Sequence, residues 1–168
     1  MPESLELAKV TGLGLNREAL AQNPRLTDPV VHDLNREPVL PFAGREFDAV
    51  ICTVSVEYLT HPEEIFREAA RVLKPGGRFI LAFSNRWFPP KVVRIWTEVL
   101  AWERPGLVLE YFLRSGAYEH LRTFSARGWP RPVTDRYFPQ VPVSDPVYAV
   151  WGQRRAYEPA SVKDAGRQ

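Results

Sequence analysis

The sequence is poor in the residues that hold metals and disulfides. Its 168 residues include one cysteine, Cys52, and three histidines. A single cysteine cannot form a disulfide within the chain and gives no basis for a cysteine-rich metal site. The histidines, which are His32, His61 and His120, show no spacing typical of metal ligands. We therefore expect no bound metal.

The features of membrane and secreted proteins are also missing. No apolar run approaches the roughly 18 residues that a membrane-spanning helix needs. Residues 1–15 carry Glu3, Glu6 and Lys9 among their apolar side chains, which is not the pattern of a signal peptide. We accordingly predict a cytoplasmic protein without a membrane partner.

No block of basic residues is present. The net charge is +2, and the later arginines are scattered among tryptophan, proline and phenylalanine. These arginines are Arg122, Arg127, Arg131 and Arg136. Such scatter is typical of a solvated surface rather than of a nucleic-acid-binding patch. We therefore predict no nucleic-acid partner.

The most informative stretch lies in the middle of the chain. Phe47–Val54 is a nearly continuous apolar run, which suits a parallel strand covered on both faces. Pro62 can open a helix, and apolar residues then recur at helical spacing. Lys74-Pro75-Gly76-Gly77 ends this helix, because proline cannot continue it and glycine permits positive φ. With a strand at Arg78–Ser84, the pattern predicts a βαβ unit of a parallel sheet.

The same reasoning predicts further elements on both sides of this unit. They are strands at Val10–Leu15, Val30–Leu34, Glu119–Ser125 and Val147–Gln153, and helices at Arg17–Gln22, Pro89–Trp102 and Leu107–Arg114. Pro105-Gly106 is expected to interrupt the chain between the last two helices. We predict a single α/β domain over residues 1–155 and a flexible tail over residues 156–168.

In order and spacing these segments resemble the class I S-adenosylmethionine-dependent methyltransferases, especially their type 11 branch. The most specific pieces are Phe47-Asp48-Ala49-Val50 and the run from Phe66 to Gly77, with Leu40-Pro41-Phe42 ahead of them. The resemblance covers roughly residues 10–125. It implies a Rossmann-like, mostly parallel sheet with an antiparallel C-terminal strand. It further implies S-adenosylmethionine as cofactor and methyl transfer to a small-molecule acceptor that the sequence does not identify.

The resemblance also implies which residues would hold the adenosine part of the cofactor. Gly14 stands where the family has an acidic residue for the ribose hydroxyls, so that carboxylate is missing. Asn16 lies nearby and could replace it, or it could simply cap the following helix. Asp33 would accept a hydrogen bond from the adenine amino group, or it could form a turn. Leu34 would offer its backbone N–H and an apolar wall to the ring.

The remaining site residues follow the strand that begins at Phe47. Ligands of open α/β sheets bind at the carboxyl ends of strands. By the resemblance, Cys52 and Thr53 would line the methionine part of the cofactor, although Cys52 suits core packing equally well. Glu57 and Tyr58 would face the substrate, where the carboxylate could act as a general base or attract the sulfonium. A plain surface position for Glu57 is the alternative.

One defining feature of the family is absent from the sequence. No glycine-rich loop follows a first strand, and Thr11-Gly12-Leu13-Gly14 occupies the place of the second strand. The strands at Val10 and Phe47 would therefore lack their common neighbour, which exposes unpaired backbone groups. The two strands could pair directly, or a partner chain could fill the gap in a homo-oligomer. The third possibility, an N-terminally truncated form of a longer protein, is the one we favour.

Two other functions remain open at this stage. The missing loop and Gly14 are compatible with a non-catalytic Rossmann-like module, or a degenerate paralogue, that acts through protein interaction. A nucleotide-binding oxidoreductase domain is disfavoured, because it also needs a glycine-rich turn after its first strand.

Overall fold

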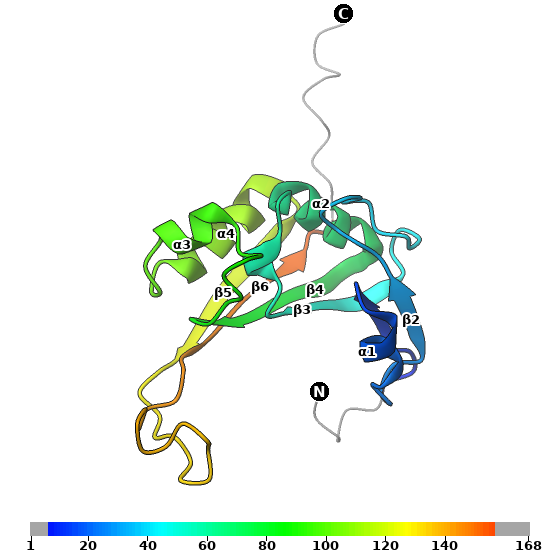
Figure 1. Cartoon of the computed structure of the whole chain (residues 1–168). Helices are drawn as coiled ribbons and strands as arrows, with labels where there is room; N and C mark the ends of the chain where they lie inside the picture. Colours follow the sequence, from blue (N-terminus) through cyan, green and yellow to red (C-terminus); the bar gives the residue numbers. More distant parts are fainter. Residues whose placement is uncertain (1–6, 157–168) are drawn as a thin grey trace, which may run out of the picture. The chain divides into compact units, whose positions relative to one another are not determined.

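The computed structural model describes residues 7–156 (Figure 1), so the tail predicted for residues 156–168 lies, apart from Ala156, outside the described residues. The chain divides between Pro38 and Val39 into two compact units. Each unit contains a sheet of its own, and the strands predicted at Val10 and Phe47 belong to different sheets. The direct pairing of these two strands is therefore not formed in the described part of the chain.

The first unit is a short strand–helix–strand motif. It consists of β1 (Thr11–Gly14), α1 (Arg17–Ala21) and β2 (Asp28–Val31), with β1 and β2 parallel. The predicted strand at Val30–Leu34 is present but lies earlier in the chain. Pro29 is tolerated inside β2, since a strand with one partner leaves alternate N–H positions unpaired. Among residues 7–38, the sheet of this unit consists of these two strands.

The second unit contains a four-stranded sheet in the order β3-β4-β6-β5. Its strands are β3 (Phe47–Thr53), β4 (Leu73–Ser84), β5 (Tyr118–Ala126) and β6 (Val147–Arg154). The β3–β4 pair is parallel, and β6 runs antiparallel to both of its neighbours. The predicted α/β class and the antiparallel C-terminal strand are confirmed. Strand β3 lies at an edge of this sheet.

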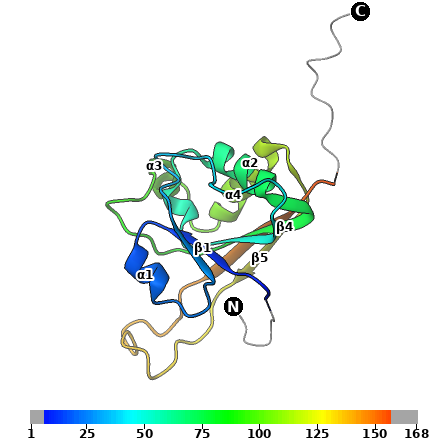
Figure 2. The same cartoon turned by 90° about the vertical axis from the view of Figure 1, so that its right-hand side faces the viewer.

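Helices of the second unit cover one face of its sheet, as Figures 1 and 2 show. They are the 3-10 helix η1 (Val56–Tyr58), α2 (Pro62–Val72), α3 (Arg94–Glu98) and α4 (Arg104–Ser115). Phe66 of α2 is fully buried and its ring makes edge contacts with Phe79, Tyr111 and Phe112 at centroid distances of 4.9–5.7 Å. This aromatic cluster joins α2, α4 and β4 into one core.

Two predictions about the helices were wrong. The helix expected over Pro89–Trp102 is reduced to Arg94–Glu98, because Val93 is extended and its N–H donates to the Glu57 carbonyl oxygen over 3.0 Å. The expected interruption at Pro105-Gly106 is absent, since both residues lie in the first turn of α4. There the missing N–H of proline leaves no helical hydrogen bond unmade.

Strand β4 begins earlier than predicted, directly after α2. Phe47 is paired with Leu73 and Ala49 with Arg78, so residues 74–77 have no partners in β3. They form a bulge of extra residues in β4, and the register of β4 against β3 shifts across it. The predicted end of the helix at this segment is nevertheless confirmed, because α2 stops at Val72.

The bulge is held by specific contacts with the start of β3. Lys74 Nζ lies 2.8 and 2.9 Å from the two carboxylate oxygens of Asp48. Gly76 has a φ of 78°, which glycine adopts without strain. A Cβ on Gly77 would lie 2.9 Å from the Lys74 carbonyl oxygen and 3.0 Å from that of Asp48. Glycine is therefore required at residue 77 by the close approach of two backbone segments.

Glycine substitutions in the second unit provide a test of this packing. We expect Gly152→Ala to lower the free energy of unfolding by about 1–3 kcal/mol, because the new methyl would meet Leu121 Cδ2 at 2.6 Å and Tyr118 Cβ at 3.2 Å. The matched change Gly106→Ala has open space in α4 and should raise stability by roughly 0.4–1 kcal/mol. Urea unfolding of both variants measures the difference; equal effects would contradict the packing described for β6.

Candidate functional site

The residues predicted to hold adenosine lie at the carboxyl ends of the two strands of the first unit. Gly14 and Val31 are paired at the ends of β1 and β2, and His32 N–H donates to the Gly14 carbonyl oxygen over 3.1 Å. Asn16 and Asp33 follow these ends within two residues each. Because parallel strands end at one edge, this places the predicted adenosine residues of the first unit together.

The side chains of Asn16 and Asp33 make local hydrogen bonds. Asn16 Oδ1 accepts from the Ala19 N–H over 3.1 Å and caps α1. Asp33 Oδ1 accepts from the Asn35 N–H over 3.0 Å and forms a turn. Both structural interpretations are thus realised, and the ligand roles of these residues stay predictions. The turn fixes the orientation of the Asp33 carboxylate.

Gly14 is not required by close packing. A Cβ at this position would lie 3.6 Å from Leu20 Cδ2, which is an ordinary contact, and the φ of Gly14 is not positive. The backbone there can therefore carry a side chain. Lack of space around the Cβ therefore does not explain why residue 14 is glycine instead of an acidic residue.

The chain turns sharply where β3 ends in the second unit. Thr53 is paired with Ala82 of β4, and Val54 adopts a φ of 50° while its N–H donates to the Ala82 carbonyl oxygen over 2.9 Å. A β-branched residue in the left-handed region is strained. Strain of this kind is concentrated at functional sites, so this strand end is the best candidate of the unit for ligand contact.

Cys52 is held as a neutral thiol. Its paired residue in β4 is Leu81, which belongs to the core. Burial and the nearby Glu57 carboxylate raise the pKa of Cys52 to about 12. A thiol with this pKa is protonated at neutral pH and is a poor nucleophile. The structure thus favours core packing for the side chain, with the backbone of Cys52 and Thr53 left for the cofactor contacts that the resemblance implies.

Glu57 is buried, so the surface alternative is wrong. Its side chain belongs to η1, and the residue is 1% exposed. Neither carboxylate oxygen accepts a hydrogen bond from another residue. Burial raises the pKa of this carboxyl, while its own backbone N–H and the charge of Arg104 act in the opposite direction. The Glu57 carbonyl oxygen accepts from the Val93 N–H over 3.0 Å.

The surroundings of Glu57 include Arg104 and Tyr148, which the sequence did not identify as functional. We call this group the Glu57 cluster: Glu57, Trp87, Trp96, Arg104 and Tyr148. Arg104 is buried. Its guanidinium lies 4.3 Å from the centroid of the Trp87 ring and 5.5 Å from the centroid of the Trp96 ring. Burial lowers the pKa of Arg104, and the nearby Tyr148 and Glu57 oppose this effect.

The polar atoms of the Glu57 cluster are only partly satisfied. Both Glu57 oxygens, Arg104 Nε and Nη1, and Trp96 Nε1 are buried without a hydrogen-bond partner. Buried groups of this kind bind water or ligand atoms. The cluster offers acceptors on Glu57 and donors on Arg104 and Trp96. It can therefore bind a polar group that both donates and accepts hydrogen bonds.

Tyr58 has a different environment from its neighbour Glu57. The residue is half-buried, and its hydroxyl oxygen accepts from the Phe88 N–H over 2.9 Å. This bond joins η1 to the segment that follows β4. Tyr58 thus positions the loop after β4, and its predicted catalytic role stays a prediction.

The described residues show neither a metal-binding cluster nor a membrane-spanning helix. Across residues 7–156, His, Cys, Asp and Glu side chains do not form a group of three or more that could hold a metal ion. In the same residues, none of the helices has the length and apolar character needed to cross a bilayer.

Comparison with known proteins shows which class of protein the chain resembles. Residues 2–81 match the family model described as "Methyltransferase domain". A chain of the solved complex between the Haloferax volcanii Trm112 methyltransferase activator and its methyltransferase superimposes with a TM-score of 0.64 at 18% identity, over 93% of this chain and 75% of that one. The chain thus resembles the S-adenosylmethionine-dependent methyltransferases in sequence over residues 2–81 and has the Rossmann-like fold of the class I enzymes.

Two relatives of the chain are named for methylation in quinone biosynthesis. The chain is 35% identical over 92 residues to the demethylmenaquinone methyltransferase of Renibacterium salmoninarum, across 54% of this chain and 38% of that protein. It is 43% identical over 61 residues to the ubiquinone/menaquinone biosynthesis C-methyltransferase UbiE of Bartonella tribocorum, across 34% of this chain and 24% of that protein. The matched part thus spans well under half the length of these relatives.

Proposed function

We propose that this chain serves in S-adenosylmethionine-dependent methyl transfer to a small-molecule acceptor. The observation that carries the proposal is the family match over residues 2–81, which includes the ends of β1, β2 and β3. In this proposal Asp33 and Leu34 of the first unit supply the adenine contacts, and the contacts of Cys52 and Thr53 to the methionine part stay a prediction from the resemblance. When bound, the cofactor supplies an electrophilic methyl group on a sulfonium.

The relatives favour an acceptor of the quinone type. The two relatives compared above are named for methylation in menaquinone or ubiquinone biosynthesis. An aromatic acceptor of this kind carries oxygens that donate or accept hydrogen bonds, which matches the unpaired polar atoms of the Glu57 cluster. In this proposal Glu57 accepts the proton that the acceptor loses. Its raised pKa makes it a stronger base, and Arg104 favours the charged form.

Titration calorimetry with S-adenosylmethionine tests the cofactor half of the proposal. We expect Asp33→Asn to weaken the binding of S-adenosylmethionine about tenfold, because the variant loses one charge-assisted hydrogen bond to the cofactor. Gly14→Asp, for which the backbone has room, should strengthen it by restoring a carboxylate at the ribose position. The matched control Asp48→Asn changes a carboxylate that is bound to Lys74 and should leave affinity unchanged. Absence of binding, or equal losses in Asp33→Asn and Asp48→Asn, would contradict the proposal.

A non-catalytic module is the second candidate, and a specific observation favours it. Gly14 provides no ribose carboxylate, and the described residues contain no glycine-rich loop between a first strand and a helix. The fold alone does not decide the reaction: the [4+2]-cyclase SpnF superimposes with a TM-score of 0.54 at 16% identity. Methyl transfer to a demethylated quinone by the purified chain, followed by mass spectrometry, distinguishes the two candidates. A product heavier by one methylene unit would exclude the non-catalytic module.

A further inference from the structure

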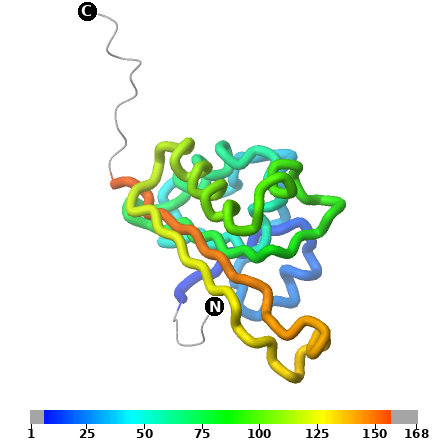
Figure 3. The backbone as a smooth tube through the Cα atoms, turned by 90° about the vertical axis from the view of Figure 1, so that its left-hand side faces the viewer, coloured from blue at the N-terminus to red at the C-terminus, as the bar shows by residue number. Residues whose placement is uncertain are grey.

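The segment between β5 and β6 extends away from the helices of the second unit. We call residues 127–146 the tip loop. Figures 1 and 3 show β5 and β6 continuing side by side beyond the helices, with the tip loop at their far end. No helix or strand longer than an isolated bridge is present in the loop.

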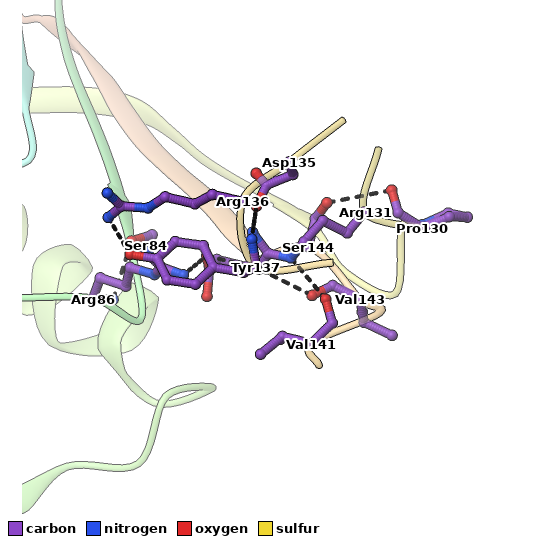
Figure 4. Close-up of polar contacts among 11 residues, drawn as sticks. Ser84, Arg86, Pro130, Arg131, Asp135, Arg136, Tyr137, Val141, Val143 and Ser144 are labelled. Atoms are coloured by element: carbon purple, nitrogen blue, oxygen red, sulfur yellow. Dashed lines mark hydrogen bonds and ion pairs between the residues drawn. The ribbon is translucent and has the colours of Figure 1, made fainter. Parts of the chain in front are cut away.

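The interior of the tip loop is polar. Arg131 is only 7% exposed, so the solvated position expected for it was wrong. Its Nε donates to the Val141 carbonyl oxygen over 2.8 Å and its Nη2 to that of Val143 over 3.2 Å (Figure 4). Ion pairs of 3.3 Å join the same guanidinium to Asp135 and Asp145. Arg131 thus organises the loop from inside.

An ion pair fixes the tip loop to the sheet. Arg86, which follows β4, lies 2.8 Å from Asp145 (Nη2 to Oδ2), and its guanidinium also stacks on the Tyr137 ring at 5.0 Å. Arg136 contacts the same phenol. The loop is therefore a structured element with a defined surface rather than an unstructured connection.

The exterior of the tip loop is apolar. Trp129 is 68% exposed and Val133 is 75% exposed, and three further apolar side chains are open to solvent. These three are Phe138, Val141 and Val143. A polar interior with an apolar exterior reverses the usual arrangement of a soluble protein. Exposed apolar surface of this kind marks an interaction site.

The charges of the tip loop select the kind of partner. The loop contains three arginines, Arg127, Arg131 and Arg136, against two aspartates, Asp135 and Asp145. Both aspartates face Arg131, and Asp145 also faces Arg86. Arg127 and Arg136 are exposed, so the outer surface combines apolar side chains with positive charge. Anionic bilayers bind this combination.

We propose that the tip loop docks on the surface of an anionic lipid bilayer, with Trp129 and Val133 in the interface and Arg127 and Arg136 near the headgroups. The exposed arginines beside exposed apolar side chains favour an anionic bilayer over an uncharged partner. The loop offers five exposed apolar side chains, which suits insertion into lipid. This inference goes beyond the proposed methyl transfer and does not depend on it.

Co-sedimentation with lipid vesicles, without any cofactor, tests the proposal. The full chain should sediment with phosphatidylglycerol–phosphatidylcholine vesicles and bind pure phosphatidylcholine vesicles more weakly, with binding that falls as salt increases. Trp129→Ser/Val133→Ser should lower the partition coefficient at least about tenfold. The matched control Trp102→Ser removes a tryptophan that is 63% exposed on the segment before α4 and should bind as the parent chain does.

A second pair of variants tests the contribution of the arginines to vesicle binding. Arg127→Gln and Arg136→Gln should each lower binding to anionic vesicles about fivefold. Arg67→Gln, on the exposed side of α2, is the control and should have no comparable effect. Failure of the parent chain to sediment with anionic vesicles would overturn the proposal. So would equal losses in the Trp102 and Trp129 variants, or a Trp129-dependent dimer in gel filtration that binds no vesicles.

Discussion

Arg104→Met is expected to lower the free energy of unfolding by about 1–3 kcal/mol at neutral pH, because a buried carboxylate would lose a positive charge that favours its ionised form. The reason is Glu57, whose buried carboxylate has Arg104 as its stabilising charge. Methionine keeps an unbranched chain against Trp87 and so removes the charge with little loss of packing. Urea unfolding followed by tryptophan fluorescence measures the change in the second unit, which contains all five tryptophans.

The effect of Arg104→Met should depend on pH with a defined sign. The pKa of Glu57 is raised above its ordinary value of 4.5 in the folded chain. The folded state therefore holds this proton more tightly, and stability falls as pH rises from about 4.5 through the raised pKa. Without Arg104 this pKa rises further, so the difference between variant and parent should be small at pH 4.5 and grow toward neutral pH.

A double variant separates charge from packing in this prediction. Glu57→Gln/Arg104→Met has no buried charge at either position and should recover most of the lost stability. The control Arg114→Met alters an exposed arginine that pairs with Glu63 and Glu110, and it should leave unfolding nearly unchanged at every pH. A loss in Arg104→Met that is the same at all pH values would mean that packing rather than charge makes Arg104 important.

Phe66→Ala is the second large prediction. Phe66 is fully buried and contacts three other rings, so truncation should lower the free energy of unfolding by about 3–5 kcal/mol. The removed ring would leave a cavity between α2, α4 and β4. Thermal and urea unfolding measure the loss. Phe88→Ala, which removes an exposed phenylalanine, is the matched control, and a comparable loss there would contradict the core described for the second unit.

The sequence predicted the elements whose patterns are local. The apolar run of β3 and the helical spacing of α2 specify their own conformations, and both were confirmed to within one residue at each end. The helix predicted from Pro89 was wrong because Val93 is extended and bonded to the Glu57 carbonyl oxygen, a contact with a distant segment. The polar site residues were placed at strand ends, and the ends of β1 and β2 are indeed adjacent.

What could not be predicted depends on contacts between distant segments. Nothing in the sequence near Arg104 signals that its guanidinium lies against Trp87 and close to Glu57, since its neighbours Pro105 and Gly106 suggested a break in structure. Arg131 likewise belongs to a scattered set of arginines, and only the fold of the tip loop shows that it is buried. Local sequence pattern alone therefore predicts poorly whether a charged side chain next to proline, glycine or tryptophan is buried or exposed.

The contact between Asp48 and the bulge at residues 74–77 has a consequence for evolution. The two segments that carry the family resemblance meet here: Lys74 binds Asp48, and Gly77 allows their backbones to approach. Selection on these residues acts through folding rather than through catalysis. A descendant that lost its enzymatic activity would keep them for as long as it needed to fold. Similarity searches that score this signature would therefore rank such a descendant beside active enzymes.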